Sequence, residues 1–390
     1  MIYVIYPEKD ATIYERTESK NTGLDSILEV SHILIGTASR YNSRVLMKFD
    51  TSQIEEQVSA GKIPENARYY LILKTAEVRE IPQEYTLYAY PVSSSWTNGT
   101  GRFVNNPIVN DGVSWRYRTS ANVGTEWDIP PTTASLEWDD VSETWIQDDG
   151  IWGNNVPTAT VTSSYFSKEG GGTWWDYDNV ECTQSFSFET QDVYMDVTSI
   201  FSKWITGSGR FNNDGLILKF SNELESSFET INSLKFFATD SNTIYVPRIH
   251  VIWDDQSFVT GSLTEVGENS LNLNVKMKKF YSQDEKAKIR IYANERFPQR
   301  SYTTQSYHMI NYHLPSSSYY EIRDAHTDEA ILPFNSTGSK ISCDESGNYF
   351  NLWMNAFQPE RFYRVVIKVE RDGGDVVEMF DNNYYFKVTR

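Results

Sequence analysis

Short stretches of apolar residues, separated by turn-forming residues, recur along the whole chain. Residues 270–277 read Ser-Leu-Asn-Leu-Asn-Val-Lys-Met, with an apolar side chain at every second position. A period of two is typical of a β-strand that buries one face. Similar short runs, rich in β-branched and aromatic residues, predict further strands. They lie at 2–6, 44–49, 69–75, 85–91, 216–220, 234–237, 248–253, 288–292, 319–323, 348–354, 363–369 and 383–388.

Two short segments among these strands predict helices. Residues 54–62 form the first, which Gly61 would end. Residues 196–205 form the second, with Asp196 as a candidate N-cap and Gly207 as the residue that would terminate it. The apolar side chains of the second segment share one helical face. They are Ile200, Phe201, Trp204 and Ile205.

The even spacing of the strands indicates an all-β protein with two sandwiches in tandem, not a βαβ array. We predict a jelly-roll or β-sandwich domain over residues 1–255, a linker at 256–261, and a smaller immunoglobulin-like β-sandwich over 262–390. Within the second domain, Arg371-Asp-Gly-Gly374 predicts a hairpin turn. The Cys…Trp…Cys signature of true immunoglobulin domains is missing, so this prediction concerns architecture alone.

Residues 97–185 differ from the rest, and we interpret them as a long Trp-rich insertion wrapped over one side of the first sandwich. Long loops in compact domains are often functional. Gly170-Gly-Gly172 is interpreted as an exposed, flexible lead-in to the tryptophans that follow. Six tryptophans are candidate contact residues for an interface or a ligand, with local packing, a subunit interface and a glycan platform all left open. They are Trp127, Trp138, Trp145, Trp152, Trp174 and Trp175.

The charge balance limits the partners. The chain has 53 acidic and 35 basic side chains, a formal net charge of -18. Such a surface repels nucleic acid, so we predict no nucleic-acid partner. No apolar run approaches the roughly 20 residues that span a bilayer, so we predict no membrane partner. The first residues lack the basic region and cleavage site of a secretory signal. Cys182 and Cys343 are expected to be isolated thiols, with a disulfide between them as the alternative.

A search for catalytic motifs gives no candidates. The sequence lacks a Gly-x-Ser-x-Gly elbow, a phosphate loop, an HExxH motif and a dinucleotide fingerprint. We therefore predict no enzyme, no catalytic residue, no cofactor and no metal. One question stays open in the acidic segment 137–149, where Asp148-Asp-Gly150 could offer oxygens to calcium without the spacing that makes a calcium site specific. A glycosidase pair cannot be singled out by spacing among so many acids.

Several stretches of the first domain carry a family resemblance: 44–50, 67–73, 94–97, 196–198 with Trp204, and 213–218. Together they resemble the DNRLRE-type jelly roll, a family similar to carbohydrate-binding modules and found in extracellular and wall-associated proteins. A second set of stretches extends over both domains: 94–102, 112–115, 170–174, 234–245, 253–255, 318–328 and 358–363. This set resembles virion structural proteins of tailed phages, especially T4-like marine phages. The acidic segment 136–156 departs from the pattern.

The resemblance implies a structural component of a bacteriophage virion, at the neck, collar or tail. Such a protein would be a homo-oligomer in a symmetric assembly, in contact with copies of itself and other virion proteins. It would be made in the host bacterial cytoplasm and end in the virion. No catalytic residue is carried over. Two alternatives stay open: a host-glycan-binding module of a fibre or capsid decoration, and a polysaccharide-degrading enzyme.

Overall fold

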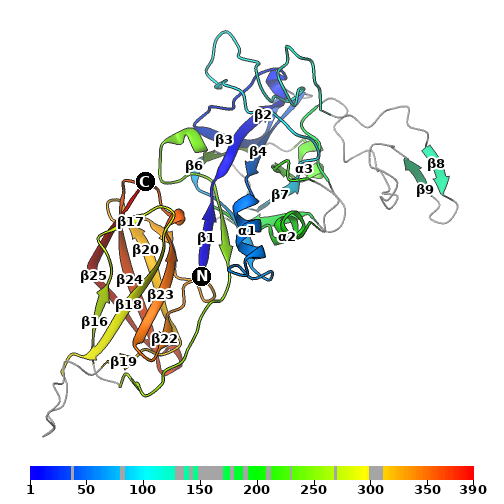
Figure 1. Cartoon of the computed structure of the whole chain (residues 1–390). Helices are drawn as coiled ribbons and strands as arrows, with labels where there is room; N and C mark the ends of the chain where they lie inside the picture. The colour runs from blue at the N-terminus through cyan, green and yellow to red at the C-terminus, as the bar shows by residue number, and fades with distance from the viewer. Residues whose placement is uncertain are drawn as a thin grey trace, which may run out of the picture. The chain divides into compact units, whose positions relative to one another are not determined.

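The computed structural model describes residues 1–36, 39–79, 84–127, 136–139, 144–147, 170–175, 180–187, 192–207, 212–228, 231–267, 270–297 and 311–390. Within these residues the chain is an all-β sandwich protein with a few short helices, so the predicted fold class is confirmed (Figure 1). Residue contacts divide the chain into two compact units. Unit 1 holds Met1–Val4 and His250–Arg390, and unit 2 holds Ile5–Ile249.

The division between the units differs from the linker predicted at 256–261. It falls inside two strands, β1 (Ile2–Ile5) and β14 (Arg248–Ile252). The first residues belong to unit 1 because their side chains pack there. The ring of Tyr3 meets Trp353 edge-on, with ring centroids 5.3 Å apart. The sequence pattern located β1 but could not show which later residues it joins.

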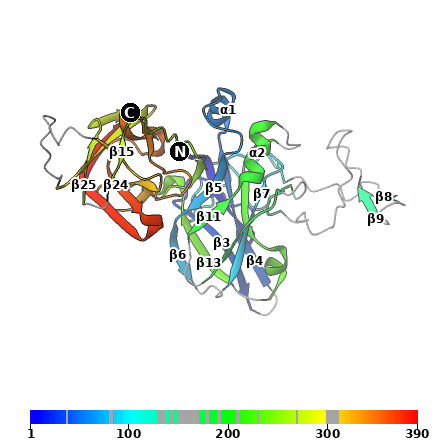
Figure 2. The ribbon, with the colours of Figure 1, turned by 90° about the horizontal axis from the view of Figure 1, so that it is seen from below.

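Unit 2 is built around one long antiparallel sheet. Its strands are β2 (Pro7–Tyr14), β3 (Ile27–Ile35), β4 (Ser39–Phe49), β6 (Thr75–Arg79), β7 (Tyr85–Pro91), β10 (Cys182–Phe186), β12 (Leu216–Phe220) and β13 (Ile231–Phe237). Their order is β10-β7-β12-β4-β3-β13-β6, with β2 also paired to β4. Figure 2 labels β6, β13, β3, β4 and β7 of this sheet. Two further antiparallel pairs are β5 (Arg68–Leu73) with β11 (Val193–Asp196), and β8 (Leu136–Asp139) with β9 (Thr144–Gln147).

Both predicted helices are present in unit 2, as α1 (Ser52–Ser59) and α2 (Thr198–Thr206), beside the short α3 (Asn222–Ser226). Gly207 ends α2 in the left-handed conformation, with φ of 62°. The cap differs from the prediction. Val197 occupies the N-cap position of α2, and Asp196 lies one residue earlier, where its Oδ1 accepts from the Thr198 amide at 2.9 Å.

Unit 1 is a two-sheet sandwich. The first sheet has the order β15-β19-β18-β23-β22, with β16 paired to β18, and the second has the order β17-β25-β24-β20-β21. Their bounds are β15 (Thr264–Glu265), β16 (Leu271–Lys276), β17 (Phe280–Ser282), β18 (Lys286–Glu295), β19 (Tyr312–His313), β20 (Ser318–Asp324), β21 (Ala330–Leu332), β22 (Ser342–Asp344), β23 (Gly347–Trp353), β24 (Phe362–Arg371) and β25 (Val376–Thr389). Rings from the two sheets form the core, as where Tyr320 stacks on Phe350 at 4.2 Å.

Single turns of 3-10 helix complete the described elements. They are η1 (Glu15–Thr17), η2 (Thr239–Ser241), η4 (Met354–Ala356) and η5 (Asp372–Gly374). The turn η5 joins β24 to β25, and Gly373 adopts a φ of 71° there. The hairpin predicted at 371–374 is therefore confirmed.

Candidate functional site

Three of the six candidate contact tryptophans lie inside unit 2. The exposed fraction is 2% for Trp127, 3% for Trp174 and 9% for Trp175. Trp127 and Trp174 join Trp96 and Trp115 in one apolar cluster that also takes residues from β2, β4, β7 and β12. These rings attach the ends of the insertion to the sheet. Of the three roles left open for these tryptophans, local packing agrees with their burial.

The other three candidate tryptophans cannot be placed in the same way. The backbone register sets Trp138 opposite Trp145 in the β8–β9 pair, but their side chains lie outside the described residues. Trp152 and the side chains of the acidic segment 137–149 also lie outside them, so the calcium question is not answered there.

Within the described ranges, no group of three or more His, Cys, Asp or Glu side chains is placed to hold a metal ion. The same residues contain no helix that has the length and apolar character needed to cross a membrane. Cys182 and Cys343 are both buried free thiols.

Buried charges lie against the tryptophan cluster. Arg44 on β4 is 6% exposed and donates through Nη2 to Glu225 Oε2 at 2.7 Å and through Nε to Oε1 at 3.2 Å. Its guanidinium also lies 4.8 Å from the ring centre of Trp115 and 5.3 Å from that of Trp174. Lys219 on β12 approaches the same Glu225 carboxylate at 3.1 Å. Burial alone would raise the pKa of Glu225, but Arg44 and Lys219 bring it below its ordinary value.

The glycine run before Trp174 is packed rather than exposed, which corrects the flexible lead-in expected from sequence. Gly171 has a φ of +90°, and its carbonyl accepts from Arg44 Nη1 at 2.6 Å. Its amide donates to the Trp115 carbonyl at 2.6 Å. A Cβ at this position would lie 2.5 Å from Arg44 Nη1, so only glycine fits.

Exposed apolar side chains occur elsewhere in the insertion, at positions that the sequence analysis missed. Phe103, Val104, Ile108 and Val123 are 48%, 83%, 49% and 74% exposed. They lie on two neighbouring loops, because the Ala121 amide and the Ser120 hydroxyl both donate to the Asn110 carbonyl, at 2.9 and 3.2 Å. We call these four residues the apolar tip. The sequence feature that could have located the apolar tip is a run of apolar residues among Gly, Asn and Pro.

The loop that carries most of the apolar tip is braced from below by Asn21, which is fully buried. Its Nδ2 donates to the carbonyls of Asn98 and Val113 at 2.6 and 2.8 Å. Its Oδ1 accepts from the amides of Gly101 and Gly23 at 2.8 and 3.2 Å. The side-chain amide thus uses all of its donors and both acceptor sites. These hydrogen bonds therefore fix the position of the loop that carries most of the apolar tip.

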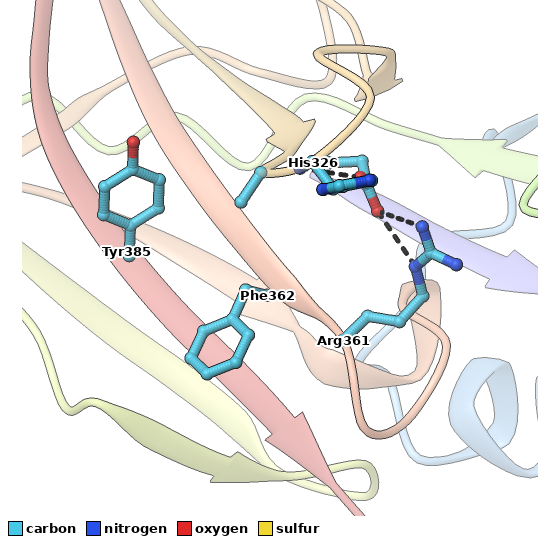
Figure 3. A pocket seen from close by; sticks show the side chains of 6 residues that line it. His326, Arg361, Phe362 and Tyr385 are labelled. Carbon is cyan, nitrogen blue, oxygen red and sulfur yellow. Dashed lines mark hydrogen bonds and ion pairs between the residues drawn. The ribbon is translucent and has the colours of Figure 1, made fainter.

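Unit 1 carries a shallow pocket of about 530 Å³ on the outside of its second sheet (Figure 3). One wall is formed by Phe362 on β24 and Tyr385 on β25, which are 54% and 43% exposed. Arg361, His326 and the loop after β20 form the other wall. The strand register explains the aromatic wall, because Tyr385 is the partner of Arg364, two residues from Phe362 on the same face.

A buried carboxylate holds the polar wall of this pocket. Asp324 is 1% exposed and accepts from Arg361 Nε and from the amides of His326 and Thr327, each at 2.9 Å. Burial would raise the pKa of Asp324, but the two amides and the guanidinium hold it below its ordinary value. This carboxylate therefore stays ionised and positions Arg361. The pocket offers aromatic faces and a few hydrogen-bonding groups, an arrangement suited to binding.

Comparison with known proteins adds no relative: no family model matches the chain, and neither the curated proteins nor the solved structures contain a match.

Proposed function

We propose that this chain is a structural subunit of a tailed-phage virion, in a symmetric neck, collar or tail assembly, and that it acts through contacts with copies of itself and other virion proteins. The observation that carries the proposal is the apolar tip. Its most exposed members, Val104 and Val123, stand on loops joined by hydrogen bonds. Apolar side chains left exposed on ordered loops are candidate anchors of protein–protein contacts.

The energetics favour a protein partner for the apolar tip. Covering a side chain such as Val104 removes its apolar surface from water, which is worth about 1.5–3 kcal/mol for a fully buried valine-sized group. The loop is already ordered by Asn21, so little conformational entropy is lost when a partner covers it. A small set of such anchors can dominate the affinity of an interface.

The decisive experiment is assembly of particles with altered chains. Val104→Asp combined with Val123→Asp should abolish incorporation of the chain into particles, while the melting temperature of the free chain stays unchanged. The matched control is Val377→Asp on β25 of unit 1, which is 53% exposed and lies outside the tip. Mass spectrometry of purified particles measures incorporation. Absence of the unaltered chain from purified virions would refute the proposed function.

A second candidate, binding of a host glycan, is favoured by the pocket of unit 1. The exposed faces of Phe362 and Tyr385 can stack on the C–H face of a sugar ring, while Arg361 and His326 offer hydrogen bonds to hydroxyls. Glycan-array binding should then be lost in Phe362→Ala and Tyr385→Ala. It should persist in Phe280→Ala, which removes a 60% exposed ring outside the pocket. No binding by the unaltered chain would count against this candidate.

A further inference from the structure

Two cations flank the aromatic wall of the pocket in unit 1. The register of β24 and β25 places Lys387 opposite Phe362 and Arg364 opposite Tyr385. Residues directly opposite each other in an antiparallel pair share one face of the sheet, so each ring has a cation beside it. Lys387 Nζ lies 5.8 Å from the ring centre of Phe362. The ligand that this wall can select therefore depends on whether these cations have partners of their own.

Both cations beside the aromatic wall are matched by carboxylates. Lys387 Nζ lies 2.5 Å from Glu360 Oε2. Arg364 contacts Asp328, and its Nη1 lies 3.3 Å from Asp381 Oδ2. Water and salt screen what remains of the field of such surface pairs. The wall consequently offers a ligand aromatic rings and no unmatched positive charge.

The cation of the polar wall is matched from inside the unit. Arg361 Nε and Nη2 both lie 2.9 Å from the same oxygen of Asp324, a residue that is 1% exposed. The Arg361 side chain is 34% exposed and lines the pocket (Figure 3). Separation of this pair would leave the buried carboxylate without its cation, so a ligand cannot easily draw Arg361 away from Asp324.

Apart from the imidazole of His326, the groups left to contact a ligand carry no net charge. Phe362 and Tyr385 offer ring faces on one side, and Arg361 and His326 offer polar groups on the other (Figure 3). A sugar ring suits both walls, because it has an apolar C–H face and a rim of hydroxyls. The volume of about 530 Å³ is sufficient for a small ligand.

We propose that this pocket selects uncharged sugar units over acidic ones, and that Asp324 sets the selection. The inference rests on glycan binding, the second candidate function, and deepens it by naming the class of sugar. An acidic sugar would bring its carboxylate to walls whose described Lys and Arg side chains are all paired. It would lose hydrating water without gaining an ion pair, a cost that a neutral sugar does not meet.

Asp324 acts on the ligand through Arg361, so it is a positioning residue. Asp324→Asn keeps an oxygen that can accept from the amides of His326 and Thr327, but it removes the charge that neutralises the guanidinium. The freed cation should then attract a sugar that carries a carboxylate. Arg361→Gln in the same chain removes that cation and should restore the original preference. A merely structural role of Asp324 would not change which sugar is preferred.

A glycan array probed with the full chain tests the selection. Oligomers of glucose, galactose and mannose are printed beside oligomers of the corresponding uronic acids, which differ by a carboxylate on each ring. The unaltered chain should bind a neutral oligomer at least about 5-fold more tightly than its acidic counterpart. Its affinity should hardly change between about 0.05 and 0.5 M salt. Measurement at pH 8, where histidine side chains are in general uncharged, removes an imidazolium from the comparison.

The variants test the role of Asp324. In Asp324→Asn the ratio of acidic to neutral affinity should rise at least about 5-fold, and in Asp324→Asn combined with Arg361→Gln it should return to the value of the unaltered chain. The matched control is Asp254→Asn, which changes the net charge equally by removing the partner of Lys340 at 2.7 Å, outside the pocket. Melting temperatures establish that each variant is folded. The preference and salt response of the unaltered chain test the selection even if Asp324→Asn does not fold.

Three results would overturn the inference: a preference of the unaltered chain for uronic acids, binding that weakens steeply with salt, or an unchanged ratio in folded Asp324→Asn. Tighter binding of a proline-rich peptide would also overturn it and assign the pocket to a peptide. If no oligosaccharide binds, the second candidate function fails with it. If binding is lost in Phe362→Ala yet favours acidic sugars, glycan binding stands and only the selection fails.

Discussion

Arg44 and Glu225 form a two-point ion pair inside unit 2, with Nη2 to Oε2 at 2.7 Å and Nε to Oε1 at 3.2 Å. Both side chains are less than a tenth exposed. The same arginine binds the Gly171 carbonyl at 2.6 Å. One guanidinium thus joins β4, the end of the insertion and α3.

Glu225→Gln should lower the free energy of unfolding by about 3–5 kcal/mol, because it leaves the Arg44 and Lys219 cations buried without their anion. Urea denaturation at pH 7 measures the loss. Glu126→Gln is the control, since it breaks an exposed pair with Arg116 at 2.8 Å and should change stability little. Equal losses in the two variants would contradict the buried pair's role.

Asn21→Ala should destabilise unit 2 and loosen the apolar tip. Removal of the side chain leaves the buried Val113 carbonyl and the Gly101 amide without partners, at about 1–3 kcal/mol for each buried group. Hydrogen exchange at Gly101 should accelerate along with the fall in melting temperature. Asn122→Ala is the control, because that side chain is exposed and lies next to Val123 rather than beneath the loop. Unchanged exchange at Gly101 would show that Asn21 does not brace the loop.

Asp10 should make the stability of unit 2 depend on pH. Burial raises the pKa of this carboxyl to about 6, although hydrogen bonds from Thr239 oppose the rise. The folded state therefore prefers the protonated form. The stabilisation from the proton is complete below the unfolded value of 3.8 and is lost as the pH rises through about 6. The slope contributed by Asp10 in that window is at most about 1.4 kcal/mol per pH unit.

Comparison with Asp10→Asn isolates this contribution. As the pH falls through about 6, the free energy of unfolding of the unaltered chain should rise relative to that of the variant. The asparagine of the variant cannot take up a proton, so the variant lacks this stabilisation. Other acids contribute equally to both proteins. Parallel pH profiles from denaturant titrations would rule out a raised pKa at Asp10.

Trp204→Ala should lower the free energy of unfolding by about 3–5 kcal/mol, as large-to-small changes of buried aromatics do. The indole is 8% exposed and meets Phe201 edge-on, with ring centroids 5.0 Å apart. Tyr194→Ala is the control, since that ring is 44% exposed and should cost less. A melting temperature near that of the unaltered chain would contradict the core position of Trp204.

Strand positions could be predicted because burial of one face imposes a period of two that is visible in single segments. The alternating run at 270–277 contains β16, whose residues are buried and exposed in turn, and Ile200, Phe201 and Trp204 bury one side of α2 as their spacing requires. These patterns are local. They depend only on residues that are close in the sequence, so they can be recognised without knowledge of the tertiary contacts.

The candidate contact residues could not be predicted in the same way. Trp174 is buried because Trp115 and Arg44, far away in the sequence, cover it. The glycine run before Trp174 was interpreted as a flexible segment. In the structure, a glycine is required at position 171 because φ is positive there and the Arg44 side chain lies close to it. The pairing of Lys276 with Arg290 could not be predicted either, since the two become neighbours only through the register of β16 and β18.

The discontinuous make-up of unit 1 has a consequence for biosynthesis. Val4 receives a hydrogen bond from Asn355 at 2.8 Å, and Met1 accepts one from the Trp253 amide at 3.1 Å. A ribosome therefore makes these first residues long before their partners exist. We expect unit 2 to fold while translation continues, and the amino-terminal strand to gain its partners only as the residues from Trp253 to Asn355 are made.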